Sequence, residues 1–183
     1  MNAKTLGLLA LLTLACDQPA VNMAPNAASF EQFQRAACRH EIGHAVYALQ
    51  FPKYIQLTRT YLVADPGSHN GAFTEFNFIE RADDFRQTVV LVGMNLAGEV
   101  GEEILGGASV NGTWSNDRTE AAKLATRLLD GKTANVPLVL AAAKELARDI
   151  LAPHAADLRR LADELYRRKK LTAQDVRQIL NER

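Results

Sequence analysis

The segment between Phe30 and Phe51 contains no proline, and its only glycine is Gly43. Apolar residues recur along it at helical spacing, which predicts one long helix. His40 and His44 lie four residues apart within it, so a helix places both imidazoles on the same face. Two imidazoles on one helical face can offer their ring nitrogens to a single ion.

Residues 40–44 read His-Glu-Ile-Gly-His, which matches the H-E-x-x-H pattern of zinc metallopeptidases. In that pattern the two histidines bind the ion, and Glu41 lies beside it to accept a proton from a water on the metal. The same five letters also occur by accident in unrelated helices, where the histidines are incidental. A glutamate in the required position between histidines four residues apart favours the metal site.

A zinc site of this type needs a third protein ligand and keeps one position for water. His69 lies in a turn-rich stretch, and His154 follows a proline in a charged helical region, so both fit poorly. Carboxylates are the better candidates. They fall into two groups, which are Glu99, Glu102 and Glu103 in one and Asp117 in the other. Spacing alone does not choose between these groups.

Turn-forming and helix-breaking residues predict the other elements. The first helix should start at a capping-box pattern formed by Ser29 and Gln32 and end at Pro52. Strands are expected over 54–63 and 72–79, separated by a turn at 65–71. A second helix is expected over about 83–105 and should end at Gly106-Gly107. A third should run from Asp117 to Gly131, with Ser115 or Asn116 as its cap, and a fourth should start at 135–137 and break or kink at Pro153. A last helix is expected over 172–181. The chain is therefore expected to be mainly α with a small β-hairpin or sheet, an α+β fold.

Three blocks of the sequence, taken together, resemble the peptidase domain of the FtsH family. They are residues 40–45 (HEIGHA), 96–107 (LAGEVGEEILGG) and 114–117 (WSND), followed by a helix rich in alanine and leucine. Members of that family are membrane-bound, ATP-dependent zinc metalloproteases with HEAGHA-, GGRxAEE- and ASND-type segments in this order. The similarity runs from about Phe30 to the C-terminus and implies a zincin-like metal helix packed in a helical peptidase domain.

The resemblance implies that Asp117 is the third zinc ligand. It places Glu102 and Glu103 nearby as supporting groups, with Glu102 as the rival ligand. Two departures stand out. The sequence contains no G-x-x-x-x-G-K-[ST] phosphate loop, so we expect no ATPase module here. Residues 97–101 carry an acid, Glu99, where the family has a base.

We therefore expect one Zn²⁺ per chain, held by His40, His44 and Asp117, with Glu41 as the catalytic base. The expected reaction is ATP-independent hydrolysis of peptides or unfolded protein segments, and a strand edge near the metal helix could hold the substrate as an added strand. A non-catalytic zinc- or peptide-binding module is the alternative. Another is a peptidase subunit that works with a separate ATPase or as a homo-oligomer.

The N-terminus predicts export. Residues 6–15 form an apolar run that is too short to span a bilayer but suits a signal peptide. Residues 12–16 resemble a bacterial lipoprotein cleavage box, so we expect a signal peptide over 1–16 and a lipid on Cys16 that anchors the protein to a membrane of the cell envelope. A flexible linker over 17–28 would then precede the peptidase domain over 29–183. Secretion with Cys16 unmodified and an uncleaved anchor are the alternatives.

Composition limits the other partners. The 21 basic and 21 acidic residues cancel, so no overall charge attracts nucleic acid. The basic cluster 167–170 suits a solvated helix end better than a membrane contact. Two cysteines provide no disulfide framework, and Cys38 should be buried and inert. Trp114 either walls a substrate pocket or fixes its loop in the core.

Overall fold

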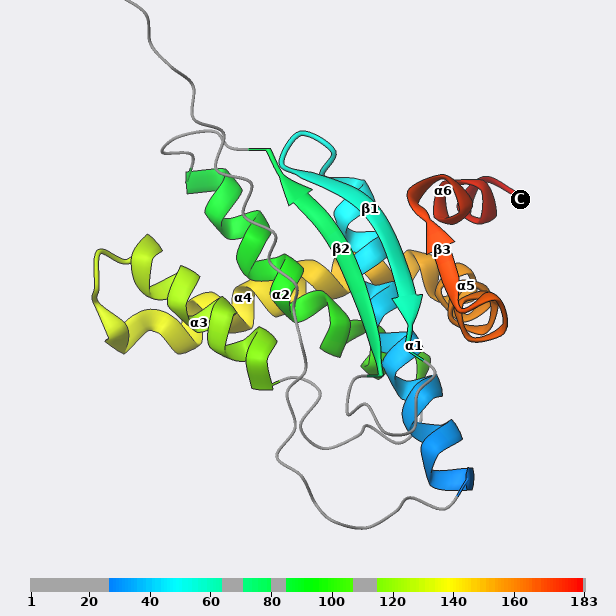
Figure 1. Ribbon diagram of the computed structural model, residues 1–183. Helices are drawn as coiled ribbons and strands as arrows, with labels where there is room; N and C mark the ends of the chain where they lie inside the picture. Colours follow the sequence, from blue (N-terminus) through cyan, green and yellow to red (C-terminus); the bar gives the residue numbers. More distant parts are fainter. Residues whose placement is uncertain (1–26, 64–70, 80–84, 107–114, 183) are drawn as a thin grey trace, which may run out of the picture.

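Figure 1 shows the computed structural model of the chain, which describes residues 27–63, 71–79, 85–106 and 115–182. In chain order the elements are α1 (Ala27–Gln50), β1 (Ile55–Leu62), β2 (Ala72–Phe78), α2 (Phe85–Leu105), α3 (Ser115–Leu128), the 3₁₀ helix η1 (Thr133–Asn135), α4 (Val136–Leu151), the 3₁₀ helix η2 (Ala152–His154), α5 (Ala155–Arg168), β3 (Lys170–Thr172) and α6 (Ala173–Asn181). The fold is mainly helical with a small antiparallel sheet, which confirms the α+β prediction. The predictions for the signal peptide, Cys16, the turn before Gly71, His69 and Trp114 fall outside the described residues.

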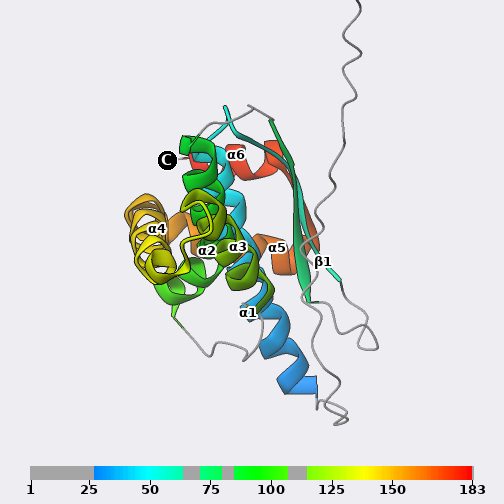
Figure 2. The same ribbon diagram turned by 90° about the vertical axis from the view of Figure 1, so that its left-hand side faces the viewer.

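Helix α1 lies at the centre of the molecule. It packs against α2, α5 and the sheet, and α2 packs in turn against α3 and α4. Figure 2 shows the strands β1 and β2 on one side of α1 and the helices α2, α3 and α4 on the other. The predicted metal helix is therefore covered on both sides.

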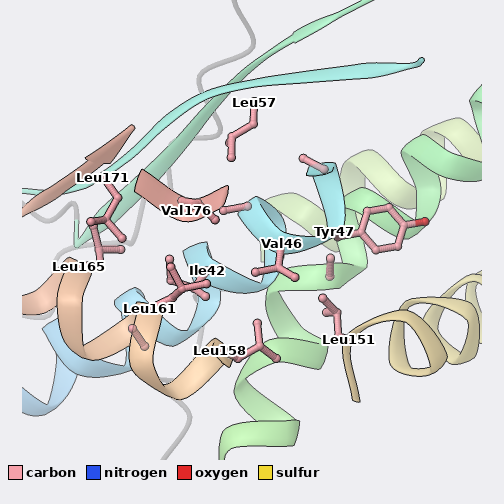
Figure 3. Close-up of a cluster of buried hydrophobic side chains, with 14 of the residues drawn as sticks. Ile42, Val46, Tyr47, Leu57, Leu151, Leu158, Leu161, Leu165, Leu171 and Val176 are labelled. Carbon is pink, nitrogen blue, oxygen red and sulfur yellow. The ribbon is translucent and has the colours of Figure 1, made fainter. Parts of the chain in front are cut away.

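The apolar core fixes the orientation of α1. Ile42 and Val46 are fully buried and point toward leucines of α5 (Figure 3). Other elements complete this core with Leu57, Leu151, Leu158, Leu161, Leu165, Leu171 and Val176. Because this side of α1 is committed to α5 and the sheet, the face that carries His40 and His44 meets α2.

The sheet has the strand order β2-β1-β3, and β1 pairs antiparallel with both neighbours. The third strand was not predicted from the sequence. It overlaps the basic cluster, because α5 ends at Arg168 and Lys169 takes a left-handed conformation with φ of 64°. Only Leu171 of β3 is buried, so a strand of three residues leaves no alternating pattern to recognise.

Two predicted helix starts are wrong by one to three residues. Helix α1 begins at Ala27, so Ser29 lies inside the first turn, because alanines at 27 and 28 favour helix. Helix α3 begins at Ser115, so neither Ser115 nor Asn116 is its cap. The first turn of a helix has no internal partners for its N–H groups, and its exact start is therefore weakly determined.

Several other predicted boundaries are confirmed, whereas the start of a helix at about residue 83 lies outside the described residues. Gly106 ends α2 with φ of 68°, and Gly131 closes the turn after α3 with φ of 79°. A proline lies in the first turn of α4, and Pro153 interrupts the chain between α4 and α5 within η2. Thr172 caps α6 in a capping box with Asp175. No helix in the described ranges is long and apolar enough to cross a membrane.

The hydroxyl of Tyr47 is buried and has no hydrogen-bond partner among the described residues. Leaving such a group unpaired costs about 1–3 kcal/mol. Tyr47→Phe keeps the ring, which lies 4.9 Å from that of Phe51, and is expected to raise the free energy of unfolding by about 1 kcal/mol. Urea denaturation of both proteins measures the change. A lower stability would contradict the prediction, because it would mean that the hydroxyl makes a bond in solution.

Candidate metal centre

The helices α1 and α2 cross in backbone contact, and two glycines permit this. A Cβ atom on Gly43 would lie 2.3 Å from the carbonyl oxygen of Ala97, and a Cβ atom on Gly101 would lie 2.9 Å from Cα of Gly43. Any larger residue would push the helices apart. The glycine within the H-E-x-x-H motif therefore lets α2 approach the two histidines.

Three side chains meet at one point beside this crossing. Nε2 of His40 lies 2.8 Å from Oδ2 of Asp117, and Nε2 of His44 lies 3.1 Å from the same oxygen. The two Nε2 atoms are 3.0 Å apart. All three side chains are buried, and together they form a group that could hold a metal ion. The histidines come from α1 and the aspartate from the first turn of α3, 73 to 77 residues later in the chain.

The outer ring nitrogens fix how these imidazoles are oriented. Nδ1 of His44 lies 2.7 Å from the backbone carbonyl of Met94, and Nδ1 of His40 lies 2.9 Å from Oε1 of Glu102. A carbonyl or carboxylate oxygen accepts hydrogen bonds, so Nδ1 carries the proton in both rings. In the neutral imidazoles the lone pair then lies on Nε2, the atom that faces the other ring and Asp117. Such outer partners are a common feature of histidines that bind metals.

The charges around the group favour a positive charge at its centre. Burial lowers the pKa of His40, but its hydrogen bonds with Asp117 and Glu102 outweigh this and raise it to about 10. Burial raises the pKa of Asp117, but the two imidazoles lower it by more. The raised pKa leaves a proton on Nε2 of His40 near neutral pH, and this proton lies beside Asp117, where a cation could take its place. A metal ion that binds here would displace a proton, as is usual for histidine sites.

Gly98 of α2 forms the floor of this group. A Cβ atom at this position would lie 2.5 Å from Cε1 and Nε2 of His40 and 2.5 Å from Nε2 of His44. Only glycine leaves room for the rings. The sequence alone indicates no role for Gly98; a glycine within a predicted helix is the available signal.

Glu41 lies on α1 between the two histidines and is 8% exposed. Burial raises the pKa of its carboxyl, and the neighbouring imidazoles oppose this only in part. The hydroxyl of Thr74 in β2 donates a 3.0 Å hydrogen bond to the backbone carbonyl of Glu41. The sheet is thereby attached to the turn of α1 that carries the motif.

The remaining candidates lie elsewhere. Glu102 contacts Nδ1 of His40, the ring nitrogen that faces away from Asp117, so it lies behind a candidate ligand. Glu99 and Glu103 form ion pairs with basic residues of α3 and α4. His154 lies in η2, 3.7 Å from Asp157. Cys38 is buried as predicted, and burial raises the pKa of its thiol to about 12, so it stays protonated.

Comparisons with known proteins do not assign this chain to a family. No protein-family model matches the sequence, and no match was found among the curated proteins. The fold and the site define an α+β protein with a buried His-His-Asp group that could hold a metal ion.

Proposed function

We propose that this protein is a zinc-dependent metalloendopeptidase that resembles the peptidase domain of the FtsH family. The observation that carries the proposal is the convergence of His40, His44 and Asp117, with the Nε2 atoms of both imidazoles directed at the same carboxylate oxygen. Histidine and carboxylate ligands that leave a further position open are typical of catalytic zinc. The order of the three sequence blocks supports the same conclusion.

The chemistry follows from the residues around the group. Zn²⁺ bound by these three ligands supplies Lewis acidity, which polarises a scissile carbonyl and makes water a better nucleophile near neutral pH. Glu41 accepts the proton of the attacking water on its carboxylate and passes it to the leaving amine. Glu102 holds His40 in the orientation that ligation requires.

Peptides or unfolded protein segments are the proposed substrates. Strand β2 is at the edge of the sheet as far as the chain is described, and Thr74 connects it to the motif. An extended peptide could add to such an edge as another strand, bound through main-chain hydrogen bonds. This mode needs no ATPase.

Two other functions are consistent with the same group. A module that binds zinc or peptides without cleaving them would keep the ligands and show no turnover. A peptidase subunit that acts with a separate ATPase or as a homo-oligomer would show low activity alone and would copurify with a partner.

Export to the bacterial envelope and lipidation of Cys16 are also part of the proposal. They rest on the sequence of residues 1–16.

The metal content of the purified protein, from Asp17 onward, tests the proposal. The wild type is expected to contain one zinc per chain, and Asp117→Ala is expected to contain none. Glu102→Ala should keep the metal but bind it about 10- to 100-fold more weakly, as is usual when a partner of a ligating histidine is removed. Elemental analysis and competition with a chromophoric chelator measure both quantities.

A wild type without zinc would overturn the proposal and leave the motif as an accident of helix composition. Zinc retained in Asp117→Ala but lost in Glu102→Ala would exchange the roles of the two carboxylates. Zinc in the wild type without cleavage of any peptide would favour the binding module.

A further inference from the structure

Glu99 lies on α2 and is 3% exposed. Arg118 of α3 donates two hydrogen bonds to it, of 2.8 and 2.6 Å, one to each carboxylate oxygen. Lys144 of α4 adds a third, of 2.5 Å. Paired contacts of this kind fix geometry as well as charge. Arg118 and Lys144 together outweigh burial and lower the pKa of Glu99 to about 2, so the carboxylate is charged.

The position of this ion pair in the two helices gives it a role. Arg118 directly follows Asp117 in the first turn of α3, and Glu99 directly follows Gly98, the floor of the group, in α2. The ion pair therefore joins the two helices one residue away from the proposed zinc ligand on one side and one residue away from the floor on the other. Figure 1 shows α3 alongside α2.

We propose that Glu99 is a positioning residue, which acts through Arg118 to hold the first turn of α3 and so keeps the carboxylate of Asp117 against both imidazoles. This inference rests on the proposed zinc site but not on peptide hydrolysis. The hydrogen bonds of Glu99 in the described residues reach Arg118 and Lys144, so its effect on Asp117 passes through Arg118.

Glu103 offers a matched control. It lies one turn after Glu99 on α2 and belongs to the same set of ion pairs, with Lys144 at 2.6 Å and Arg148 at 2.6 Å. Its described ion pairs reach α4 alone, whereas Glu99 also reaches α3. The charge of Glu103 also acts on Arg118, but loss of Glu103 leaves both hydrogen bonds between Arg118 and Glu99 in place and mainly weakens the packing of α4.

Zinc affinity of the intact protein, measured by competition with a chromophoric chelator, tests this role. Glu99→Gln and Arg118→Gln are each expected to weaken zinc binding by about tenfold or more, and Glu103→Gln by less than about twofold. The double variant should bind zinc no more weakly than the weaker-binding single variant, because both changes break the same contact between Glu99 and Arg118. The absorption spectrum of Co²⁺ in the site should shift in the first two variants only. The Arg118 side chain is 55% exposed, so its variant keeps the fold and tests the contact even where Glu99→Gln does not fold.

The inference is overturned if both single variants bind zinc as the wild type does. It is equally overturned if Glu103→Gln matches them, or if the effects of Glu99→Gln and Arg118→Gln simply add. A wild type that binds no zinc removes the site, and the proposed function and this role fall together. Zinc binding without peptide cleavage would overturn only the proposed function. The zinc affinities of the variants would then still decide the role of Glu99.

Discussion

Glu41→Gln is expected to leave zinc bound and to reduce peptide hydrolysis by about 10²- to 10⁴-fold. Glutamine has the shape of glutamate but cannot accept a proton near neutral pH. The side chain is buried on α1 and does not belong to the His-His-Asp group, so its replacement leaves the three ligands in place. Cleavage of a fluorescently labelled unfolded protein and the zinc content of the same samples measure the two effects.

Glu31→Gln is the matched control for this experiment. Glu31 lies on the same helix, is exposed and forms an ion pair with Arg35, one helical turn along. Its replacement should change neither zinc content nor rate. Near-normal hydrolysis by Glu41→Gln would rule out the proposed base. Loss of zinc from that variant would show that Glu41 supports the metal rather than the proton transfer.

Gly98→Ala is expected to abolish zinc binding and to lower the free energy of unfolding by about 1–3 kcal/mol. The added Cβ atom would lie 2.5 Å from ring atoms of both His40 and His44, so the rings must turn away from each other and from Asp117. The hydrogen bonds at Nδ1 would then be lost with the metal site. Elemental analysis and urea denaturation measure both losses.

Gly106→Ala separates these effects from a general cost of replacing glycine. Gly106 has φ of 68°, and a Cβ atom there would meet nothing within 4 Å. The left-handed conformation should cost about 1 kcal/mol of stability, while zinc binding stays unchanged. If Gly98→Ala keeps its zinc, the close approach of α2 to the imidazoles is not needed for the site.

Local signals in the sequence were sufficient for much of the fold. The motif, the prolines and the glycines act through backbone conformation within a few residues, so α1, the end of α2 and the start of α4 could be predicted. Thr172 could be assigned to the start of the last helix for the same reason. The starts of α1 and α3 were less certain, because a helix gains or loses one residue at its end at little cost.

Contacts between distant residues could not be predicted in this way. The partner of His44 is the backbone carbonyl of Met94, and no side-chain pattern reveals which carbonyl meets a given ring. Gly98 becomes important only because α2 crosses α1 at that point. Glu99 was a candidate ligand by residue type, but its pairing with Arg118 depends on how α3 returns to α2. Asp117 itself came from the resemblance, since spacing did not distinguish it from the glutamates.

The two imidazoles differ in whether a mutation can remove the group that accepts the hydrogen bond from Nδ1. His44 is oriented by a main-chain carbonyl, which every amino acid at position 94 would supply. His40 is oriented by the side chain of Glu102, which a single codon change can remove. Natural variation in this protein would therefore alter the ring of His40 far more easily than that of His44. If the group binds a metal ion as proposed, Glu102 is the position at which selection could adjust metal affinity in small steps without losing the site.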